Sequence, residues 1–289
     1  MKVLKKICLL MLLIGFGSLK SQTITYGSNS NEIMNLSNGN LFVVLSGDEK
    51  FDKLVQSSIT NYWKHNKDFK AINASEIENL INDEKNYFIS VMTYGVGTSM
   101  IIGSGKNAGK QELVFFNGGK KKLSAYSYGM MIATIPIMLE NIKFCPSQTD
   151  CLIKALNDGI QIVIANKIEG LSGKVMYAVL KDLRKKTSLL KNKTLLIDKE
   201  IIINEDVLAK YKYKYKVLSS NEIASIIETN SKEYCILSTG YYPFKQLFIH
   251  DFESKEVVYG ISTQGSLDIG VKDFIKLNEI IEGKEIDKK

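Results

Sequence analysis

Two cysteines six positions apart, Cys145 and Cys151 in the stretch FCPSQTDC, could form a disulfide, a redox pair or part of a metal site. They lack CxxC spacing and a neighbouring histidine, which disfavours redox and metal chemistry. The N-terminus of the chain indicates export, and in an oxidising compartment a disulfide would close the seven-residue loop between them. We therefore expect a structural disulfide, with free thiols as the alternative. Cys235, in the apolar run EYCILS, is expected to be a small buried hydrophobe.

The two histidines offer little for catalysis. His65 and His250 have no Cys, His or carboxylate at metal-ligand spacing except Asp251, which would point to the opposite face of a strand. The sequence contains no GxSxG, HExxH or paired-carboxylate signature. The Gly-rich stretch GVGTSMIIGSGKNAG, residues 95–109, departs from a Walker A loop and is interpreted as a long connection between strands. We expect no cofactor and no metal, and these patterns favour a non-catalytic protein over an enzyme.

Polar side chains follow the apolar runs that we interpret as parallel strands. Ser46 and Asp48 follow LFVVL, and Glu200 follows TLLID. Tyr94 and Tyr241 come after the runs YFISVMT and YCILSTG. Ligands of open α/β sheets bind outside the carboxyl ends of parallel strands, so these five residues are the candidate ligand-facing positions. The alternative is that they cap helices and cover the edge of the sheet.

The stretch KYKYKYK, residues 210–216, is typical of a polyanion site in which bases stack on tyrosines while lysines hold phosphates. Comparison of the chain with itself places Tyr211 at a helix end and Tyr215 in a strand, so the alternation has no continuous face. We expect Tyr215 to face the core beside Val217, and only Tyr211 and Tyr213 to be candidates for exposed rings.

An internal repeat positions all of these residues. The segment FKAINASEIENLINDEKNYFISVMTY, residues 69–94, aligns with YKVLSSNEIASIIETNSKEYCILSTGY, residues 215–241, with one insertion. Upstream, NLFVVLSGD matches KTLLIDKE, and downstream ELVFFNGGKKKLSAY, residues 112–126, matches QLFIHDFESKEVVYG. We interpret this as the duplication of a unit of roughly ninety residues.

Each unit is predicted to have the order βαβαβββα, which gives a fold of the α/β (mixed α+β) class with mixed sheets. Continuous β-branched runs such as LFVV indicate strands buried on both faces, and FDKLVQSSITNYW has apolar residues at helical spacing. Ser75 and Asn221 are the predicted caps of the next helices. A hairpin turn is expected at Asn117-Gly118-Gly119, and PIMLENI, residues 136–142, is the predicted closing helix of the first unit.

A helical insert separates the two units. Thr149 or Asp150 is expected to cap a helix over residues 151–168, and the insert is expected to fill the groove between the units. The predicted boundaries are a signal peptide at 1–21, a flexible segment at 22–40, unit one at 41–145, the helical insert at 146–192, unit two at 193–283 and a tail at 284–289.

The N-terminus has the pattern of a targeting signal. Three lysines, at 2, 5 and 6, precede the apolar run ICLLMLLIGF, and small or polar residues follow it. As a helix this run spans about 15 Å, roughly half of a bilayer core. We therefore expect a cleaved signal peptide and a periplasmic or secreted mature chain. No later run reaches the length of a membrane span, so the mature chain is not expected to span a membrane.

Cleavage changes the charge balance. The chain has 38 Lys and Arg against 31 Asp and Glu, but residues 1–21 carry four lysines and no acid. The mature chain therefore has 34 basic and 31 acidic residues, a balance of +3. A chain this close to neutral does not imply a polyanionic partner, and we do not expect nucleic acid.

The succession of LKNKTLLID, YKVLSSNEIASII and YCILS, behind a short signal that ends near Ser21 and Gln22, resembles exported proteins of Bacteroidetes-type bacteria to which no activity is assigned. At the level of the fold, the βαβαβ unit is also similar to small envelope domains, such as the N-terminal domain of the Tol translocation protein and the lipoprotein activators of peptidoglycan synthases. Those domains bind other proteins. The resemblance implies a partner that is another envelope or secreted protein.

Two functional hypotheses follow from the sequence. The first is a non-catalytic exported protein whose duplicated units present a surface for protein interaction. The alternative is a small-ligand receptor or enzyme with its site at the carboxyl ends of the parallel strands.

Overall fold

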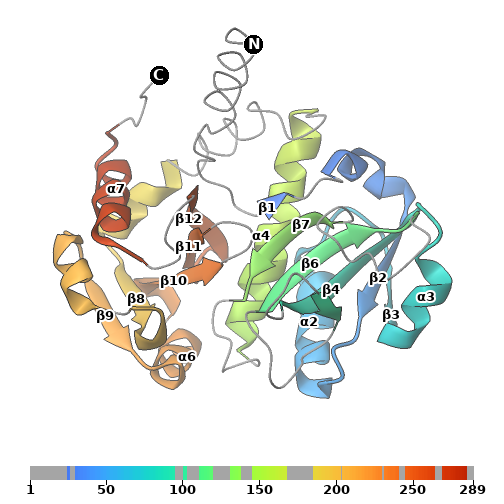
Figure 1. Ribbon diagram of the computed structural model, residues 1–289, viewed down its shortest axis with the longest axis horizontal. Helices are drawn as coiled ribbons and strands as arrows, with labels where there is room; N and C mark the ends of the chain where they lie inside the picture. The colour runs from blue at the N-terminus through green and yellow to red at the C-terminus, as the bar shows by residue number, and fades with distance from the viewer. Residues whose placement is uncertain are drawn as a thin grey trace, which may run out of the picture.

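The computed structural model describes residues 25–26, 30–94, 100–102, 111–119, 131–137, 145–167, 185–202, 204–229, 231–240, 245–263 and 269–284. These residues form a mixed α/β protein with one seven-stranded and one five-stranded sheet. The two sheets lie on either side of a long central helix (Figure 1). The signal peptide predicted at 1–21 lies outside the described residues.

The first sheet belongs to unit one and has the order β1-β7-β6-β4-β2-β3, with β5 paired to β4. Strands β3, β2 and β4 run parallel, whereas β6, β7, β1 and β5 pair antiparallel with their neighbours. The strands are β1 (Thr25–Tyr26), β2 (Asn40–Val44), β3 (Phe69–Ile72), β4 (Asn86–Tyr94), β5 (Met100–Ile102), β6 (Gln111–Asn117) and β7 (Met131–Pro136).

The second sheet repeats this topology. Its order is β12-β11-β10-β8-β9, so β8, β9, β10, β11 and β12 correspond to β2, β3, β4, β6 and β7. Strands β9, β8 and β10 are again parallel, and β11 and β12 pair antiparallel. The mixed fold and the two similar units therefore agree with the duplication predicted from the sequence. The strands are β8 (Thr194–Asp198), β9 (Tyr215–Leu218), β10 (Tyr234–Gly240), β11 (Lys245–Asp251) and β12 (Glu256–Thr263).

The helices of the two units are less alike than the strands. The helix after β2 has four turns, whereas the connection after β8 contains two short 3₁₀ helices, η6 and η7. The elements of unit one are η1 (Ser30–Asn38), α2 (Glu49–Tyr62), η2 (Ala74–Glu76), α3 (Ile77–Leu80) and α4 (Pro146–Ala165). Those of unit two are η5 (Ser188–Lys191), η6 (Lys199–Ile201), η7 (Glu205–Lys210), α6 (Ser220–Thr229), η8 (Ser231–Glu233) and α7 (Val271–Ile281).

Three predictions for residues 22–142 differ from the structure. The segment 22–40 was expected to be flexible, but its second half forms η1, whose Ile33 and Leu36 are fully buried. The hairpin partner of β6 is β7 and not the strand expected before Tyr126, and residues 120–130 lie outside the described part. The closing helix expected at 136–142 cannot begin at Pro136, because Pro136 ends β7; residues 138–142 also lie outside the described part.

Among the described residues, α4 is the helix that follows β7 and packs on unit one. It follows the last strand of unit one and packs on α2, as α7 follows the last strand of unit two and packs on η7, the counterpart of α2. The sequence predicted its cap at Thr149 or Asp150, but α4 begins at Pro146 with Cys145 as its N-cap. Proline suits the first helical position because its missing N–H would have no partner there.

The earlier start of α4 explains why the predicted disulfide is wrong. Cys145 and Cys151 are free, buried thiols separated by six helical steps, a rise of about 9 Å, whereas a disulfide needs Cα atoms within roughly 7 Å. Cys145 Sγ instead donates a hydrogen bond to Glu228 Oε1 at 2.9 Å. Burial, together with this hydrogen bond, raises the pKa of the Cys145 thiol to about 12. Cys235 is fully buried, as expected.

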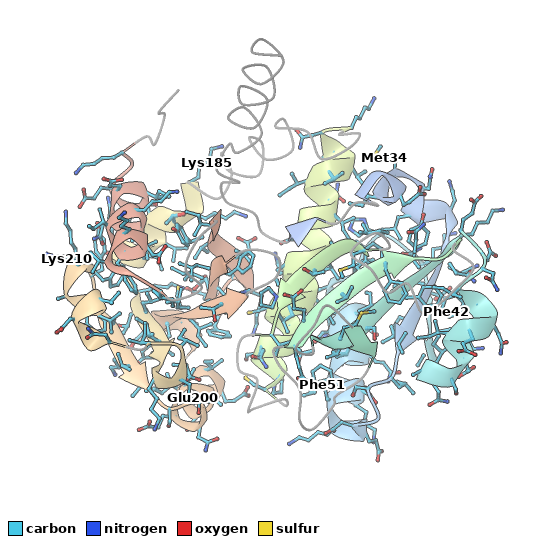
Figure 2. The ribbon with its side chains drawn as sticks, viewed as in Figure 1. Met34, Phe42, Phe51, Lys185, Glu200 and Lys210 are labelled. Carbon is cyan, nitrogen blue, oxygen red and sulfur yellow. The ribbon has the colours of Figure 1, made fainter. Side chains whose placement is uncertain are left out.

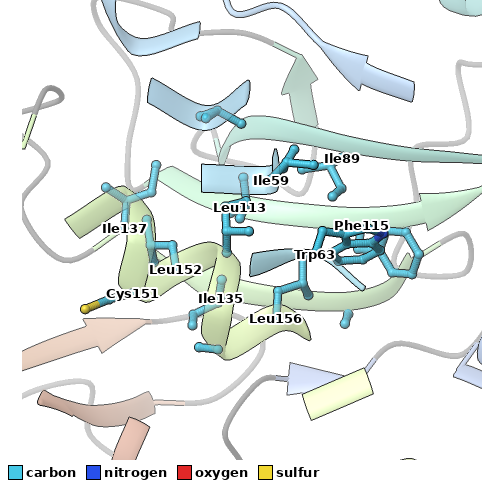
Figure 3. Close-up of a cluster of buried hydrophobic side chains, with 14 of the residues drawn as sticks. Ile59, Trp63, Ile89, Leu113, Phe115, Ile135, Ile137, Cys151, Leu152 and Leu156 are labelled. Carbon is cyan, nitrogen blue, oxygen red and sulfur yellow. The ribbon is translucent and has the colours of Figure 1, made fainter. Parts of the chain in front are cut away.

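One hydrophobic core joins both units around α4. On one side Leu152 and Leu156 lie against Ile135 of β7 and the side chains of α2 (Figure 3). On the other side the same core continues into unit two through Ile236 and Phe248. The first helix of the predicted insert, α4, therefore packs between the two units. Although α4 has 20 residues, no helix in the described ranges combines the length and the apolar character needed to cross a membrane.

Free thiols can be counted directly. The described residues include three cysteines, all free thiols, and we predict that iodoacetamide in denaturant adds three carbamidomethyl groups to a chain that lacks residues 1–21, without any prior reduction. Reduction before alkylation is the control and should leave the mass unchanged. One group without reductant and three after reduction would instead show that Cys145 and Cys151 form a disulfide.

Candidate functional site

The predicted ligand-facing residues of unit one serve the start of α2. Asp48 is the N-cap of this helix, and its Oδ1 accepts hydrogen bonds from the N–H groups of Lys50 and Phe51 at 3.2 and 3.3 Å. Ser46 Oγ accepts from the Asp48 N–H at 3.2 Å. The buried carboxylate of Asp52 accepts from the Ser46 N–H at 2.7 Å. Ser46 and Asp48 therefore follow the alternative interpretation, in which these residues serve the cap of a helix.

The remaining predicted residues do not complete a site with them. Glu200 lies in η6, where its N–H donates to Asp198 Oδ1 at 3.0 Å. Figure 2 shows Glu200 and Phe51, in the first turn of α2, on different units. Tyr94 ends β4, but its side chain is outside the described part, as is all of Tyr241. The predicted residues of unit one and those of unit two therefore occupy equivalent places in two separate sheets.

A hollow is found at the opposite end of the parallel strands. Two adjoining pockets of about 230 and 600 Å³ lie at the amino ends of β2 and β3. We call them together the amino-edge groove; its lining includes Leu41, Trp63, Asn66, Lys67, Asp68 and Phe69. This groove lies away from the positions that the sequence indicates, which are all at the carboxyl ends of the strands.

Hydrogen bonds make the floor of the groove rigid. Asn66 Nδ2 donates to the carbonyl oxygens of Leu36 and Gly39, both at 2.9 Å, and so ties the end of η1 to the loop after α2. Trp63 Nε1 donates to Asn66 Oδ1 at 3.1 Å. Gly39 must be glycine, because a Cβ atom there would lie 2.2 Å from the ring of Tyr87. The groove is therefore preformed.

The groove opens beside an unpaired strand edge. Strand β3 is the outermost strand on its side of the described sheet, and Leu45 N donates to Ile72 O at 2.8 Å. In a parallel ladder this register directs the N–H and C=O groups of Lys70 and Ile72 to β2, and those of Phe69 and Ala71 outward. Outward backbone groups can pair with another extended chain. Phe69 is half-buried and offers apolar surface at the same place.

The groove has no catalytic constellation among the residues that the structure describes. Its side chains include no Cys, His or Ser-His pair. No group of three His, Cys, Asp or Glu in the described ranges could hold a metal ion. What the groove offers is apolar surface, the exposed lysines Lys67 and Lys70, and backbone hydrogen-bonding groups. These features suit binding.

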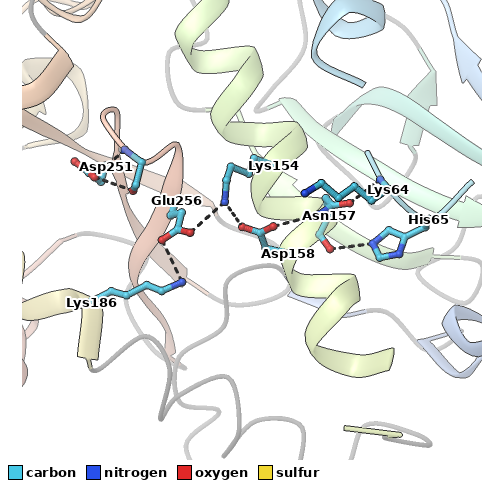
Figure 4. Close-up of polar contacts among 9 residues, drawn as sticks. Lys64, His65, Lys154, Asn157, Asp158, Lys186, Asp251 and Glu256 are labelled. Atoms are coloured by element: carbon cyan, nitrogen blue, oxygen red, sulfur yellow. Dashed lines mark hydrogen bonds and ion pairs between the residues drawn. The ribbon is translucent and has the colours of Figure 1, made fainter. Parts of the chain in front are cut away.

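A second polar cluster joins α4 to both units (Figure 4). Lys154 Nζ lies 2.5 Å from Asp158 Oδ2 in α4 and 3.1 Å from Glu256 Oε1 in β12. On the other side Asn157 O lies 3.0 Å from His65 Nε2 of unit one. Lys154 and Asn157 have partners across the joint, and Asp158 is held within α4 by Lys154, so this cluster fixes α4 between the units.

His250 is a buried ionisable side chain whose ring nitrogens lack hydrogen-bond partners among the described residues. Its ring is fully buried in β11, 6.3 Å from the ring of Phe248. Burial lowers the pKa of His250 to about 3. Among the described residues no proton donor or acceptor lies beside this ring, so they provide no catalytic geometry for His250.

Comparison of the chain with protein-family models, with curated proteins and with solved structures finds no match among them.

The burial of His250 predicts how stability depends on pH. An unfolded histidine binds its proton below about pH 6.5, whereas folded His250 stays neutral down to about pH 3, so acid favours the unfolded state. His250→Leu should therefore be at least as stable as the parent near pH 7, since the removed polar groups have no partners. Between about pH 7 and pH 4.5 it should lose about 2.5 kcal/mol less stability than the parent.

Urea unfolding at both pH values measures this difference. Burial also lowers the pKa of His65, so His65 contributes with the same sign, but it is present in both proteins and cancels in the comparison. Equal losses of stability in parent and variant would show that folded His250 takes up its proton normally.

Proposed function

We propose that this protein is a non-catalytic, exported interaction module that binds an extended segment of another envelope or secreted protein at the amino-edge groove. The observation that carries the proposal is the free edge of β3, which opens directly beside a preformed groove. Addition of a strand to a sheet edge obtains affinity from backbone hydrogen bonds and specificity from pockets for side chains.

The site matches the demands of that mode of binding. Phe69 and Ala71 direct backbone groups outward, and the half-buried ring of Phe69 and the side chain of Leu41 offer apolar contact for one side chain of the incoming segment. The surface is held by α2 and η1 through Asn66, so little conformational entropy is lost on binding. Export, which the N-terminal pattern predicts, would bring the groove into contact with other envelope or secreted proteins.

The alternative, a small-ligand receptor or enzyme at the carboxyl ends of the strands, has weaker support. Ser46 and Asp48 are already engaged in the turn and the cap that begin α2. A ligand at that position would have to displace these hydrogen bonds, which stabilise a helix by about 1 kcal/mol.

The proposal is tested by photo-crosslinking in the native envelope. A photoreactive amino acid in place of the exposed Lys70 should form an adduct with another protein, whereas the same group in place of Lys53, exposed on α2, should not. Ala71→Pro removes an outward N–H without touching the ladder to β2 and should reduce the adduct at least about tenfold.

Ala71→Ser is the matched control, because it keeps the N–H and should keep the adduct. Recovery of monomer alone from position 70, or an adduct that Ala71→Pro leaves unchanged, would contradict binding at this edge. Circular dichroism of both variants confirms that they are folded.

A further inference from the structure

The β9 edge of unit two is the counterpart of β3 but presents different chemistry. Strand β9 is the outermost strand on its side of the second sheet, and Leu195 N donates to Lys214 O at 2.9 Å. The parallel register then directs the backbone groups of Lys216 to β8 and those of Tyr215 and Val217 outward. Side chains of alternate residues lie on opposite faces, so Lys216 is on one face of the edge and Tyr215 and Val217 are on the other.

The edge carries a high density of positive charge. Lys210, Lys212, Lys214 and Lys216 are all exposed. Among the acids described nearby, Glu282 is engaged by Lys212 at 2.6 Å and by Lys284 at 2.7 Å. Lys214 and Lys216 flank the outward backbone groups, and Lys216 Nζ lies 5.6 Å from the ring centroid of Tyr234.

The tyrosines do not form a stacking platform for bases. Tyr211 is buried and Tyr213 is half-buried, with ring centroids 5.7 Å apart in an edge-to-face arrangement. Tyr215, which the sequence predicted to face the core, does lie on the same face as Tyr211, 6.2 Å away, but it is 39% exposed because it stands at the sheet edge. The prediction that Tyr211 could be exposed is wrong. A single exposed ring offers no ladder for nucleic acid.

Charge selects among the chains that could pair with this edge. A second copy of β9 would bring lysines against lysines, which is unfavourable in a pair of strands, and lysines on an edge strand are a common protection against self-association. An acidic strand is attracted by the same charges. Its alternate apolar side chains would lie over Tyr215 and Val217, while its acidic side chains would lie beside Lys216.

We propose that the β9 edge binds an extended polypeptide of alternating acidic and apolar residues, which adds to the second sheet as a further strand. This site is distinct from the amino-edge groove and does not depend on it. The partner is defined by its pattern: acids on one face, β-branched or other apolar residues on the other, and free backbone groups along one side.

The probe is a fluorescein-labelled peptide of alternating Glu and Val, about ten residues long, titrated with the mature chain by fluorescence anisotropy. Binding should weaken as salt rises. Lys216→Glu should weaken it at least about tenfold, whereas Lys85→Glu, which reverses an exposed charge in unit one, should leave it unchanged.

The backbone contribution is tested separately. Val217→Pro removes an outward N–H and should weaken binding at least about tenfold, whereas Val217→Ala, which keeps it, should stay within about threefold of the parent. Should Val217→Pro fail to fold, N-methylation of alternate residues of the peptide removes the opposing donors, and one of the two methylation registers should abolish binding. Ala71→Pro should not affect this peptide, so failure here is distinguishable from failure of the β3 proposal.

Three results would overturn the proposal. The first is the absence of binding at low salt. The second is tighter binding of a single-stranded oligonucleotide that depends on Lys216 but not on Val217→Pro, which would assign the edge to nucleic acid. The third is a dimer of the protein in sedimentation that Val217→Pro dissolves, which would assign the edge to a second copy.

Discussion

Burial of the apolar side chains of α4 between the two units is the constraint on which the rest of the structure depends. Its apolar side chains must be covered, and α4 packs against α2 and β7 of unit one and against β12 and α6 of unit two, while Asp150, Lys154 and Asp158 lie on a partly exposed polar stripe. It follows the last strand of unit one, as α7 follows the last strand of unit two. It contacts unit two, however, on the face of the second sheet that carries α6. The duplicated units therefore pack through non-equivalent faces, and Lys154, bonded to Asp158 and Glu256, fixes their relation.

In this arrangement the outer edges of β3 and β9 have no pairing strand among the described residues. The edges of β3 and β9 lie at opposite ends of the molecule, with α4 between them (Figure 1). Each edge has the same register of outward backbone groups, but the surroundings differ: a preformed groove with Trp63 at β3, and exposed lysines with Tyr215 at β9. Duplication followed by divergence of the flanking loops has thus given two edges of different chemistry on one body.

Much of the fold was predictable, because continuous apolar strands and the repeat are local signals. The helix caps were harder to predict. The helices after β3 and β9 are capped by Asn73 and Ser219, each two residues before the cap predicted from the sequence. The reason is that Glu76 and Glu222 accept hydrogen bonds from the backbone N–H groups of Asn73 and Ser219 and so close the capping boxes there. The cysteine spacing suits a loop or a helix equally, and only Pro146 indicated a helix start. The groove was not predictable because contacts between segments far apart in sequence build it.

The central claim is that α4 makes the two units a single cooperative body. Trp63, the one tryptophan of the chain, reports on unit one, and the fully buried thiol of Cys235 reports on unit two. Urea unfolding should be followed by tryptophan fluorescence and, in the same samples, by pulsed alkylation of Cys235 quantified by peptide mass spectrometry. Coincident midpoints are expected for a shared core. Alkylation of Cys235 at urea concentrations where Trp63 remains native would contradict it.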